Sequence, residues 1–233
     1  MNKDQLLLEL QNREIKCDEN QADEMIKFMR FVLSWNEKIN LTAITDEESF
    51  MEKMIFDSAI GISELDLTEK SVLDVGTGAG FPGVILYLLN PKAHITLLDS
   101  TSKKINLLKE YAASNNYSYD AISVRAEEYA RNHREKYDYV FARAVAPLNI
   151  LLELCIPLLK VGGTFVVLKG PGAEDEIIDS KKAFSKLNAR IGKIIVDELP
   201  ESGEVRNIIH IIKDKKTSEK YPREYKEIKR LPL

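Results

Sequence analysis

Glycines recur at close spacing directly after a short apolar run, in the stretch VLDVGTGAGFPG (72–83). Glycine is needed where a backbone turns sharply and approaches a ligand closely, because it has no Cβ to obstruct either. Pro82 suits the first turn of a following helix, where its missing N–H would have no partner. This strand, loop and helix context is typical of a cofactor-binding loop, and the alternative is a turn that serves only packing. The glycines are Gly76, Gly78, Gly80 and Gly83.

The pattern of this loop is compatible with two classes of cofactor. Gly78, Gly80 and Gly83 match the G-x-G-x-x-G pattern of dinucleotide-binding proteins, which would make the chain a nicotinamide-dependent oxidoreductase. That interpretation extends the strand through Gly76 and Thr77, both poor strand residues, and leaves a strand aspartate unexplained. If the strand instead ends at Gly76, the pattern becomes D-x-G-x-G-x-G, which suits a cofactor without a pyrophosphate. The sequence therefore favours S-adenosylmethionine.

Acidic residues follow the next two apolar runs. Asp99 ends the run ITLLD, where a carboxylate can accept two hydrogen bonds from a ribose diol. The alternative is an ordinary aspartate in a turn. Arg125, Ala126 and Glu127 follow the third run, and a backbone amide and a carboxylate there can contact the edge of an adenine ring. A glutamate at a helix start is also favoured by the helix dipole alone, so this second signal is evenly balanced.

Arg143 stands among small apolar residues in ARAVAPL (142–148), where an arginine is costly without an anionic or hydrogen-bonding partner. Its candidate partners are a cofactor carboxylate, a substrate phosphate and a base edge, and the alternative is an internal salt bridge.

The chain has no Asp/Asn-Pro-Pro-aromatic motif, with which amino-group methyltransferases orient an exocyclic amine, and neither Cys17 nor Cys155 is placed to attack a pyrimidine. A ring nitrogen with a free lone pair can be methylated without this motif and without a cysteine nucleophile, because alignment and desolvation suffice for its attack on the methyl group.

These residues must be positioned by a sheet. Apolar runs alternate with helical segments from Ser71 onward, which predicts right-handed βαβ units and a parallel sheet. The last two runs are joined by ELPESGE, which is too short for a crossover helix, so they should pair antiparallel. The expected strands are Val72–Val75, His94–Asp99, Tyr119–Val124, Tyr137–Phe141, Thr164–Leu168, Gly192–Glu198 and Val205–Ile212.

The segment before the sheet, residues 1–66, is predicted to be helical. Asn20 is the expected N-cap of a helix whose apolar residues recur at helical spacing, and NEKINLT (36–42) interrupts that helix. Thr45 and Glu48 form a capping box for the next helix, which should run toward Leu65.

Composition narrows the class of protein. With 233 residues, 44% hydrophobic and 30% charged, the chain is typical of a soluble globular protein with one domain and a small appendage. No stretch approaches the length of a membrane span, and the histidines and cysteines are never at metal-ligand spacing. Two cysteines suit a reducing compartment, so we expect a cytoplasmic protein without metal or membrane. The net charge of −4 gives no global sign of nucleic acid.

The chain resembles the RsmG, or glucose-inhibited division protein B (GidB), family of bacterial 16S ribosomal RNA guanine-N7 methyltransferases. The glycine loop is shared by many methyltransferases, whereas W-N-x-x-x-N-L-T and R-A-V-A-P-L are more specific. The resemblance covers nearly the whole length and rests on Trp35-Asn36, Asn40-Leu41-Thr42, Asp57-Ser58, DVGTGAGFPG (74–83), RAVAPL (143–148), Leu168-Lys169-Gly170 and Tyr221-Pro222-Arg223.

The resemblance implies a Rossmann-like class I fold with a seven-stranded, mostly parallel sheet, an antiparallel last strand and an N-terminal helical segment. It implies S-adenosyl-L-methionine as cofactor, 16S rRNA in the 30S subunit as partner, and no catalytic general base. The cofactor contacts carried over are Gly76, Gly78, Phe81, Asp99, Ala126, Glu127 and Arg143. The residues placed near the RNA or the target base are Arg125, Arg143, Lys169 and Arg206, with Arg143 and Lys169 as positioning groups.

The chain departs from the family pattern at two places. Met54 stands where the family usually has a histidine, and the tail after Tyr-Pro-Arg is EYKEIKRLPL. We expect a helical cap (1–66), a methyltransferase domain (67–213) and a basic tail (214–233), in a monomer. Between Lys213 and Arg230 there are eight basic and four acidic side chains, which can follow phosphates or simply be solvated.

Two other functions stay open. The chain can methylate another RNA site or a small molecule, or it can be a non-catalytic assembly factor that binds S-adenosylmethionine or RNA.

Overall fold

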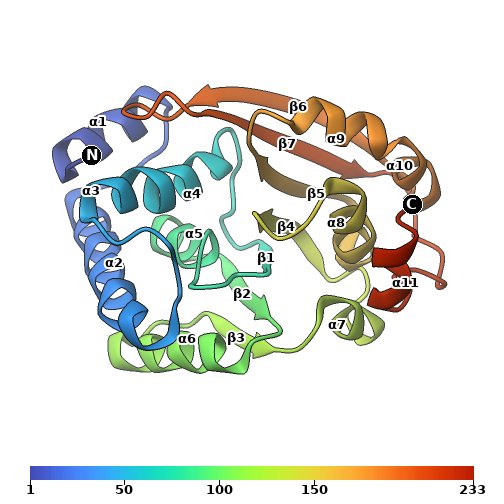
Figure 1. Ribbon diagram of the computed structural model, residues 1–233, viewed down its shortest axis with the longest axis horizontal. Helices are drawn as coiled ribbons and strands as arrows, with labels where there is room; N and C mark the ends of the chain where they lie inside the picture. The colour runs from blue at the N-terminus through green and yellow to red at the C-terminus, as the bar shows by residue number, and fades with distance from the viewer.

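The computed structural model describes the whole chain, residues 1–233, except the side chain of Glu37. A seven-stranded sheet runs through the molecule with helices on both faces (Figure 1). The order of the strands is β3-β2-β1-β4-β5-β7-β6. Their bounds are β1 (Ser71–Val75), β2 (His94–Asp99), β3 (Asp120–Ser123), β4 (Tyr137–Arg143), β5 (Leu159–Lys169), β6 (Ala189–Glu198) and β7 (Val205–Lys213).

The pairing of the strands confirms the predicted fold class. Strands β1 to β5 pair in parallel with one another. The last strand, β7, is antiparallel to both β5 and β6, as the short connection ELPESGE requires. The chain leaves β1 in one direction, through β2 and β3, and returns to place β4 on the other side of β1. This reversal makes the carboxyl ends of β1 and β4 the topological switch point, where ligands bind in sheets of this kind.

Burial explains the continuous apolar strands. Val166 and Leu168 of β5 belong to the hydrophobic cluster on one face of the sheet, and Phe165 and Val167 belong to the cluster on the other face. Successive side chains of a strand point to opposite faces, so both faces need apolar residues when both are covered by helices.

The first 62 residues supply helices to one face of the sheet, at the left of Figure 1. Their buried aromatic side chains Phe28, Phe50 and Phe56 share a hydrophobic cluster with Val72 of β1 and with β5. The division of the chain into cap, domain and tail stays a prediction. The elements are α1 (Lys3–Asn12), α2 (Glu19–Ile39), α3 (Glu47–Phe50), a π-helical segment η1 (Met51–Phe56), α4 (Asp57–Ala59) and a 3-10 turn η2 (Ile60–Ile62).

Two predicted helix caps are wrong by one or two residues. The N-cap of α2 is Asp18, not Asn20: its carboxylate accepts a hydrogen bond from the Gln21 N–H, and the Gln21 side chain accepts one from the Asp18 N–H. The N-cap of α3 is Asp46, which accepts from the Ser49 N–H, so the expected capping box of Thr45 does not form. Aspartate is as good an N-cap as asparagine or threonine, and sequence alone does not choose between neighbouring candidates.

The remaining helices lie between the strands in the sequence or after the last strand, and they cover the sheet. No helix of the described chain is both long enough and apolar enough to cross a bilayer. In Figure 1 the N-terminus lies at the left and the C-terminus at the right, beside α8. The helices are α5 (Gly83–Leu89), α6 (Ser102–Asn115), α7 (Ala126–Asn132), α8 (Leu148–Cys155), a 3-10 turn η3 (Ile156–Leu158), α9 (Ala173–Asp179), α10 (Lys181–Leu187) and α11 (Tyr225–Arg230).

Candidate functional site

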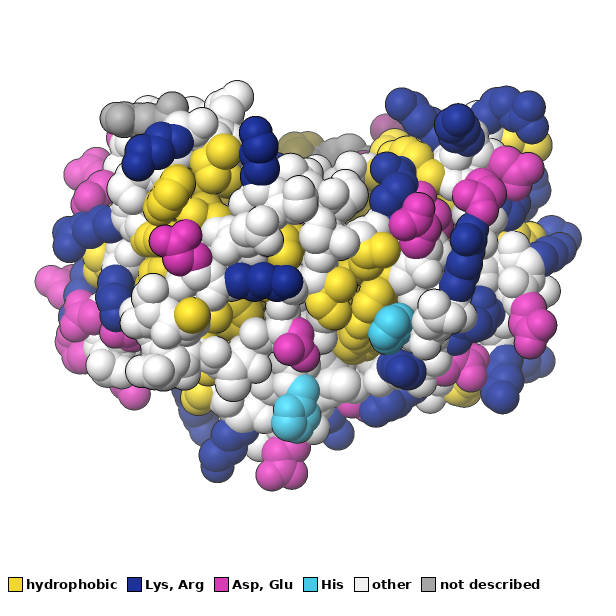
Figure 2. Space-filling model, turned by 90° about the horizontal axis from the view of Figure 1, so that it is seen from below, with side chains coloured by type: hydrophobic (Ala, Val, Ile, Leu, Met, Phe, Trp, Pro, Cys, Tyr) yellow, Lys and Arg dark blue, Asp and Glu magenta, His cyan; other side chains and the backbone are white. Residues whose placement is uncertain are grey.

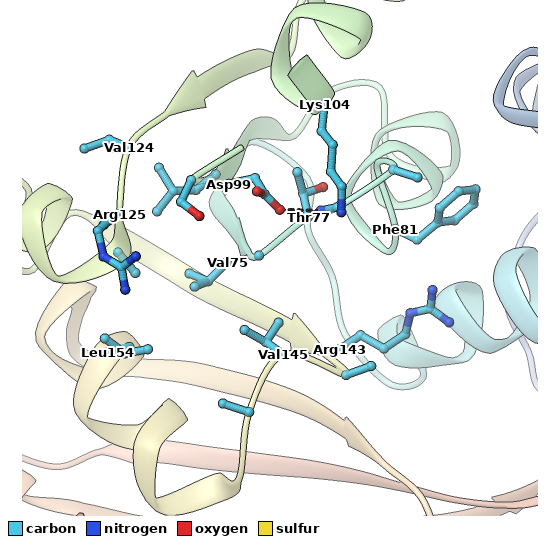
Figure 3. A pocket seen from close by; sticks show the side chains of 18 of the residues that line it. Val75, Thr77, Phe81, Asp99, Lys104, Val124, Arg125, Arg143, Val145 and Leu154 are labelled. Carbon is cyan, nitrogen blue, oxygen red and sulfur yellow. Dashed lines mark hydrogen bonds between the residues drawn. The ribbon is translucent and has the colours of Figure 1, made fainter. Parts of the chain in front are cut away.

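A cavity of about 420 Å³ opens at the carboxyl ends of β1, β2 and β4. In Figure 3, Asp99 and Thr77 lie at its centre, Lys104 reaches in from α6, and Arg125 and Arg143 stand on opposite sides. Eight of the residues expected at the site line this one cavity. They are Gly76, Gly78, Phe81, Asp99, Arg125, Ala126, Glu127 and Arg143.

The glycine loop brings backbone to the floor of the cavity. Gly76 has a φ of +74°, and a Cβ there would lie 2.6 Å from Cγ2 of Val145, so only glycine fits. Gly78 has a φ of +58°, and a Cβ there would meet nothing closer than a backbone oxygen at 3.9 Å, so its backbone faces open space. The strand ends at Val75, which agrees with the shorter of the two strand interpretations.

Asp99 joins the loop to the end of β2. Its Oδ2 accepts a hydrogen bond from the Gly78 N–H at 3.0 Å, and its Oδ1 accepts one from the Thr101 N–H at 2.8 Å. These bonds hold the carboxylate in one orientation. Because each carboxylate oxygen can accept two hydrogen bonds, both oxygens retain capacity for a diol in the cavity.

A second carboxylate, Asp74, lies beneath the loop and is fully buried. Its Oδ2 accepts a hydrogen bond from the Gly83 N–H at 2.9 Å, which ties β1 to the start of α5. Its Oδ1 and the hydroxyl of Thr77 have no hydrogen-bond partner among the described residues. Burial raises the pKa of Asp74 to about 6. Asp74 is therefore a support of the loop and not a lining residue.

The residues after β3 form another side of the cavity. Glu127 is almost fully buried, and its Oε1 accepts a hydrogen bond from Nε of Arg125 at 2.5 Å. The guanidinium of Arg125 also lies 4.4 Å from the ring centre of Tyr225, in a cation–π contact. One oxygen of Glu127 remains for another donor.

Arg143, the last residue of β4, has the internal salt bridge that was one of its open alternatives. Its Nη1 donates to Oδ2 of Asp57 at 3.0 Å, and its Nη2 lies 3.1 Å from Sδ of Met54. The other oxygen of Asp57, Oδ1, accepts from Nε of Arg206 at 3.0 Å. The Nε–H of Arg143 is nevertheless buried and has no partner among the described residues. A ligand acceptor in the cavity would satisfy it.

The structure places Lys169 and Arg206 outside the cavity lining. Lys169 donates to the carbonyl of Ala146 at 2.8 Å and pairs with Glu176 at 2.7 Å. Arg206 reaches the site only through Asp57.

Sequence patterns assign no site role to several lining residues, because neither a motif nor an apolar run shows which of its side chains faces a cavity. Leu41 and Val145 belong to family motifs, and Met54 stands where the family usually has a histidine. The lining residues that sequence reasoning missed include Leu41, Met54, Lys104, Val145, Leu154 and Tyr225.

Comparisons with known proteins agree with this geometry. A family profile described as "GidB: rRNA small subunit methyltransferase G" matches residues 21–202. The ribosomal RNA small subunit methyltransferase G of Alkaliphilus metalliredigens is 43% identical over 210 residues, which cover 88% of each chain. The protein of the same description from Bacillus cytotoxicus is 39% identical and covers 100% of this chain and 99% of its own length.

Solved structures share the fold at low identity. TYW2 of M. jannaschii in complex with AdoMet has a TM-score of 0.56 at 14% identity, covering 73% of this chain and 79% of that one. A SAM dependent methyltransferase from Aquifex aeolicus has a TM-score of 0.51 at 19% identity, covering 77% and 98%. These two likenesses concern the fold alone. Because the profile and the curated relatives extend over most or all of the sequence, the chain belongs to the rRNA small subunit methyltransferase G family.

Proposed function

We propose that this chain transfers a methyl group from S-adenosyl-L-methionine to N7 of a guanine in bacterial 16S ribosomal RNA. The observation that carries the proposal is the convergence of the glycine loop, Asp99 and Arg143 on one cavity at the switch point of the sheet, in a chain of this family. Methylation of small-subunit rRNA is the activity for which the family is named, and guanine N7 follows from the sequence resemblance.

The cavity suits the cofactor in size and in polarity. A volume of about 420 Å³ is within the range of about 300–1,000 Å³ typical of small-molecule sites. The orienting groups present are the free acceptor capacity of Asp99, the open backbone of Gly78 and the unpaired Nε–H of Arg143. The first suits a ribose diol, and the last suits a carboxylate. The residues proposed to bind the cofactor are Gly76, Gly78, Phe81, Asp99, Ala126, Glu127 and Arg143.

The proposed reaction needs no general base from the protein. The cofactor supplies a methyl group bonded to a cationic sulfur, and guanine N7 carries a lone pair and no proton. The protein therefore has to hold the base in line and exclude water. Arg143 is held by Asp57 and Lys169 by Glu176, so both cations already have a carboxylate partner and serve to position.

Four basic residues are proposed to lie near the RNA. Arg143 and Arg206 share the carboxylate of Asp57, which keeps two positive groups together, one of them in the cavity lining. The other two are Arg125 and Lys169. On the face shown in Figure 2, the outline is hollowed between two lobes, and Lys and Arg side chains are interspersed with Asp and Glu. A surface of mixed charge agrees with the net charge of −4, and we infer that any contacts with phosphates are made by few residues.

The test is methylation of 30S subunits in single-turnover experiments between pH 6.5 and 9. Because no proton leaves before attack, we expect a nearly flat rate of the chemical step, with RNA integrity checked at each pH. Mass-spectrometric mapping of nucleosides should find N7-methylguanosine at one position. A tenfold rise of the rate per pH unit would exclude the base-free mechanism, and a different nucleoside would exclude the substrate. Binding of labelled cofactor without transfer to any subunit preparation would favour a non-catalytic assembly factor.

A further inference from the structure

The C-terminal segment, residues 214–233, does not extend into solvent as a free basic tail. Its buried side chains Tyr221, Ile228 and Leu233 are at most 9% exposed and belong to the hydrophobic cluster that contains α8. Figure 1 shows α11 beside α8 and above α7, at the right of the molecule. The segment is therefore part of the fold next to the cavity.

A buried ion pair fastens this segment to α8. The side chain of Glu153 is fully buried, and its Oε1 accepts from the backbone N–H of Arg223 at 2.9 Å and from its Nε at 2.8 Å. Its Oε2 accepts from Nη2 of Arg223 at 2.6 Å. A buried charge that loses such a partner is costly, so the two side chains depend on one another. We call this pair the Glu153–Arg223 latch.

A second arginine, from the body of the protein, holds the chain just before the latch. Arg134 donates through Nη2 to the carbonyl of Thr217 at 2.8 Å and through Nη1 to the carbonyl of Tyr221. By contrast, the pair of Arg131 with Glu224 is at the surface, with side chains 56% and 66% exposed. A surface pair of this kind contributes little. The polar anchoring therefore rests on Arg134 and the latch, in addition to the apolar packing of Tyr221, Ile228 and Leu233.

Two residues beyond the latch, Tyr225 reaches the cavity. It lines the cavity together with Leu154 of α8 and with Arg125, whose guanidinium lies 4.4 Å from the centre of the tyrosine ring. Arg125 in turn pairs with Glu127. The backbone two residues before Tyr225 is thus fastened by the bonds of Arg223 to Glu153, and the ring itself contacts Arg125. It stands at the end of the cavity formed by the residues after β3, the end proposed to take adenine.

We propose that the C-terminal segment is a wall of the cofactor site, and that Tyr225, positioned by the Glu153–Arg223 latch and by Arg125, closes its adenine end. This inference rests on the proposed function. It assigns a binding role to Tyr225, and a positioning role to Glu153 and Arg223. Contact of a base with an aromatic side chain is worth about 1–3 kcal/mol, so loss of the ring should weaken cofactor binding about tenfold or more.

The first experiment measures binding of S-adenosylmethionine and S-adenosylhomocysteine by calorimetry. Y225A should raise the dissociation constant about tenfold, and Y225F, which keeps the ring, should stay within about twofold of the unchanged protein. The matched control is E224Q, one residue earlier, which removes only the surface pair and should bind normally. Equal affinity of Y225A and the unchanged protein, with equal melting temperatures, would overturn the proposal.

The second experiment tests the latch by trypsin cleavage at Lys226, Lys229 and Arg230. E153Q should speed cleavage there and weaken cofactor binding, whereas E224Q should do neither. By reciprocity, S-adenosylhomocysteine should slow cleavage in the unchanged protein. Cofactor that binds without protecting these sites would also overturn the proposal. If E153Q does not fold, Y225A and the protection experiment still decide. If the unchanged protein binds no cofactor, the proposed function fails first, which separates the two outcomes.

Discussion

At the residue scale, three aspartates around the cavity have different environments and therefore different roles. Asp99 lines the cavity and keeps free acceptor capacity, Asp57 is shared between two arginines, and Asp74 is sealed beneath the glycine loop. A carboxylate that receives few hydrogen bonds in a buried site is easily protonated, and Asp74 is of this kind. Two of these differences lead to direct tests.

For Asp99, the substitution to alanine should weaken binding of S-adenosylmethionine by about 1.5–3 kcal/mol, the scale of hydrogen bonds to a charged group. Calorimetry measures the affinity, and circular dichroism checks that the fold is intact. Unchanged affinity in a folded variant would remove Asp99 from the site.

For Asp74, the raised pKa predicts how stability depends on pH. The folded pKa is about 6 and the ordinary value 3.8, so the folded state holds the proton more tightly than the unfolded state does. Stability should therefore fall as the pH rises from about 4 to about 6, and the loss should persist above that, on the order of 3 kcal/mol. D74N keeps an oxygen for the Gly83 N–H and carries no charge. In urea titrations it should be more stable than the unchanged protein at pH 7.5 but not at pH 4.

Asp138 provides a control of opposite sign. Burial alone would raise its pKa, but hydrogen bonds from Lys160 and Ser71 lower it to about 2. Its contribution to stability is present above the ordinary pKa of 3.8 and is lost as the pH falls toward 2. D138N should therefore destabilise the protein at pH 7.5, where D74N stabilises it. If both substitutions had the same sign, the assignment of the raised pKa to Asp74 would be wrong.

At the element scale, the glycine loop works because α5 packs directly on the ends of β1 and β2. Every residue of α5 is buried, and its first residue, Gly83, touches both strands. A Cβ at Gly83 would lie 2.1 Å from Cδ2 of Leu97 and 2.8 Å from Oδ2 of Asp74. Close helix–strand packing is thus the reason for glycine at this position, whereas at Gly78 the reason is the left-handed φ of +58°.

G83A should consequently destabilise the fold by about 1–3 kcal/mol, the cost of overpacking a well-packed core. The matched control is G172A, because a Cβ at Gly172 would meet nothing within 4 Å and its φ is negative. Urea unfolding should show a loss for the first variant and a change within about 0.5 kcal/mol for the second. A G83A protein as stable as G172A would show that α5 can shift away from the strands at no cost.

At the scale of the whole molecule, the N-terminal helices and the sheet share one hydrophobic cluster. Phe28 of α2 stacks near Phe81 of the glycine loop, with ring centres 5.2 Å apart, and Arg13 after α1 pairs with Asp197 of β6 at 2.6 Å. Segments joined in this way should not unfold independently. Because Phe28 contacts Phe81, which lines the cavity, substitutions that disturb the N-terminal helices should also disturb the site.

The single tryptophan, Trp35, lies in α2, so its fluorescence can test whether the N-terminal helices unfold together with the sheet. In urea, the unfolding curve from Trp35 fluorescence should coincide with the curve from far-ultraviolet circular dichroism, which reports on the whole chain. R13Q should move both midpoints together. Separate transitions would show that residues 1–66 are an independent unit. The purely helical pattern of this segment, followed by alternating strands and helices, would by itself suggest such a unit.

The parts that sequence determined are local. Strands, helices and the glycine loop can be predicted because their patterns repeat over two to four residues, and all seven strands lie where predicted. Their ends agree or differ by up to five residues: β3 is one residue shorter at each end, and β5 begins five residues earlier. The position of Asp99 followed too, since a residue at the end of a parallel strand must lie at the ligand edge of the sheet. The caps of α2 and α3 were placed wrongly because adjacent residues have nearly equal capping energies.

Only the tertiary structure decided which distant residues meet. Asp57 bonds to Arg143 86 positions later and to Arg206 149 positions later, and Arg223 meets Glu153 across 70 positions. No periodicity relates such residues, because the entropy of closing a loop changes only slowly with its length and so does not select partners. Burial selects these pairs, because the buried charges of Asp57 and Glu153 are costly without an opposite charge from the segment that packs against them. For the same reason the basic tail, which its composition allowed to be either solvated or bound to phosphates, is packed beside the cavity with Tyr225 at its edge.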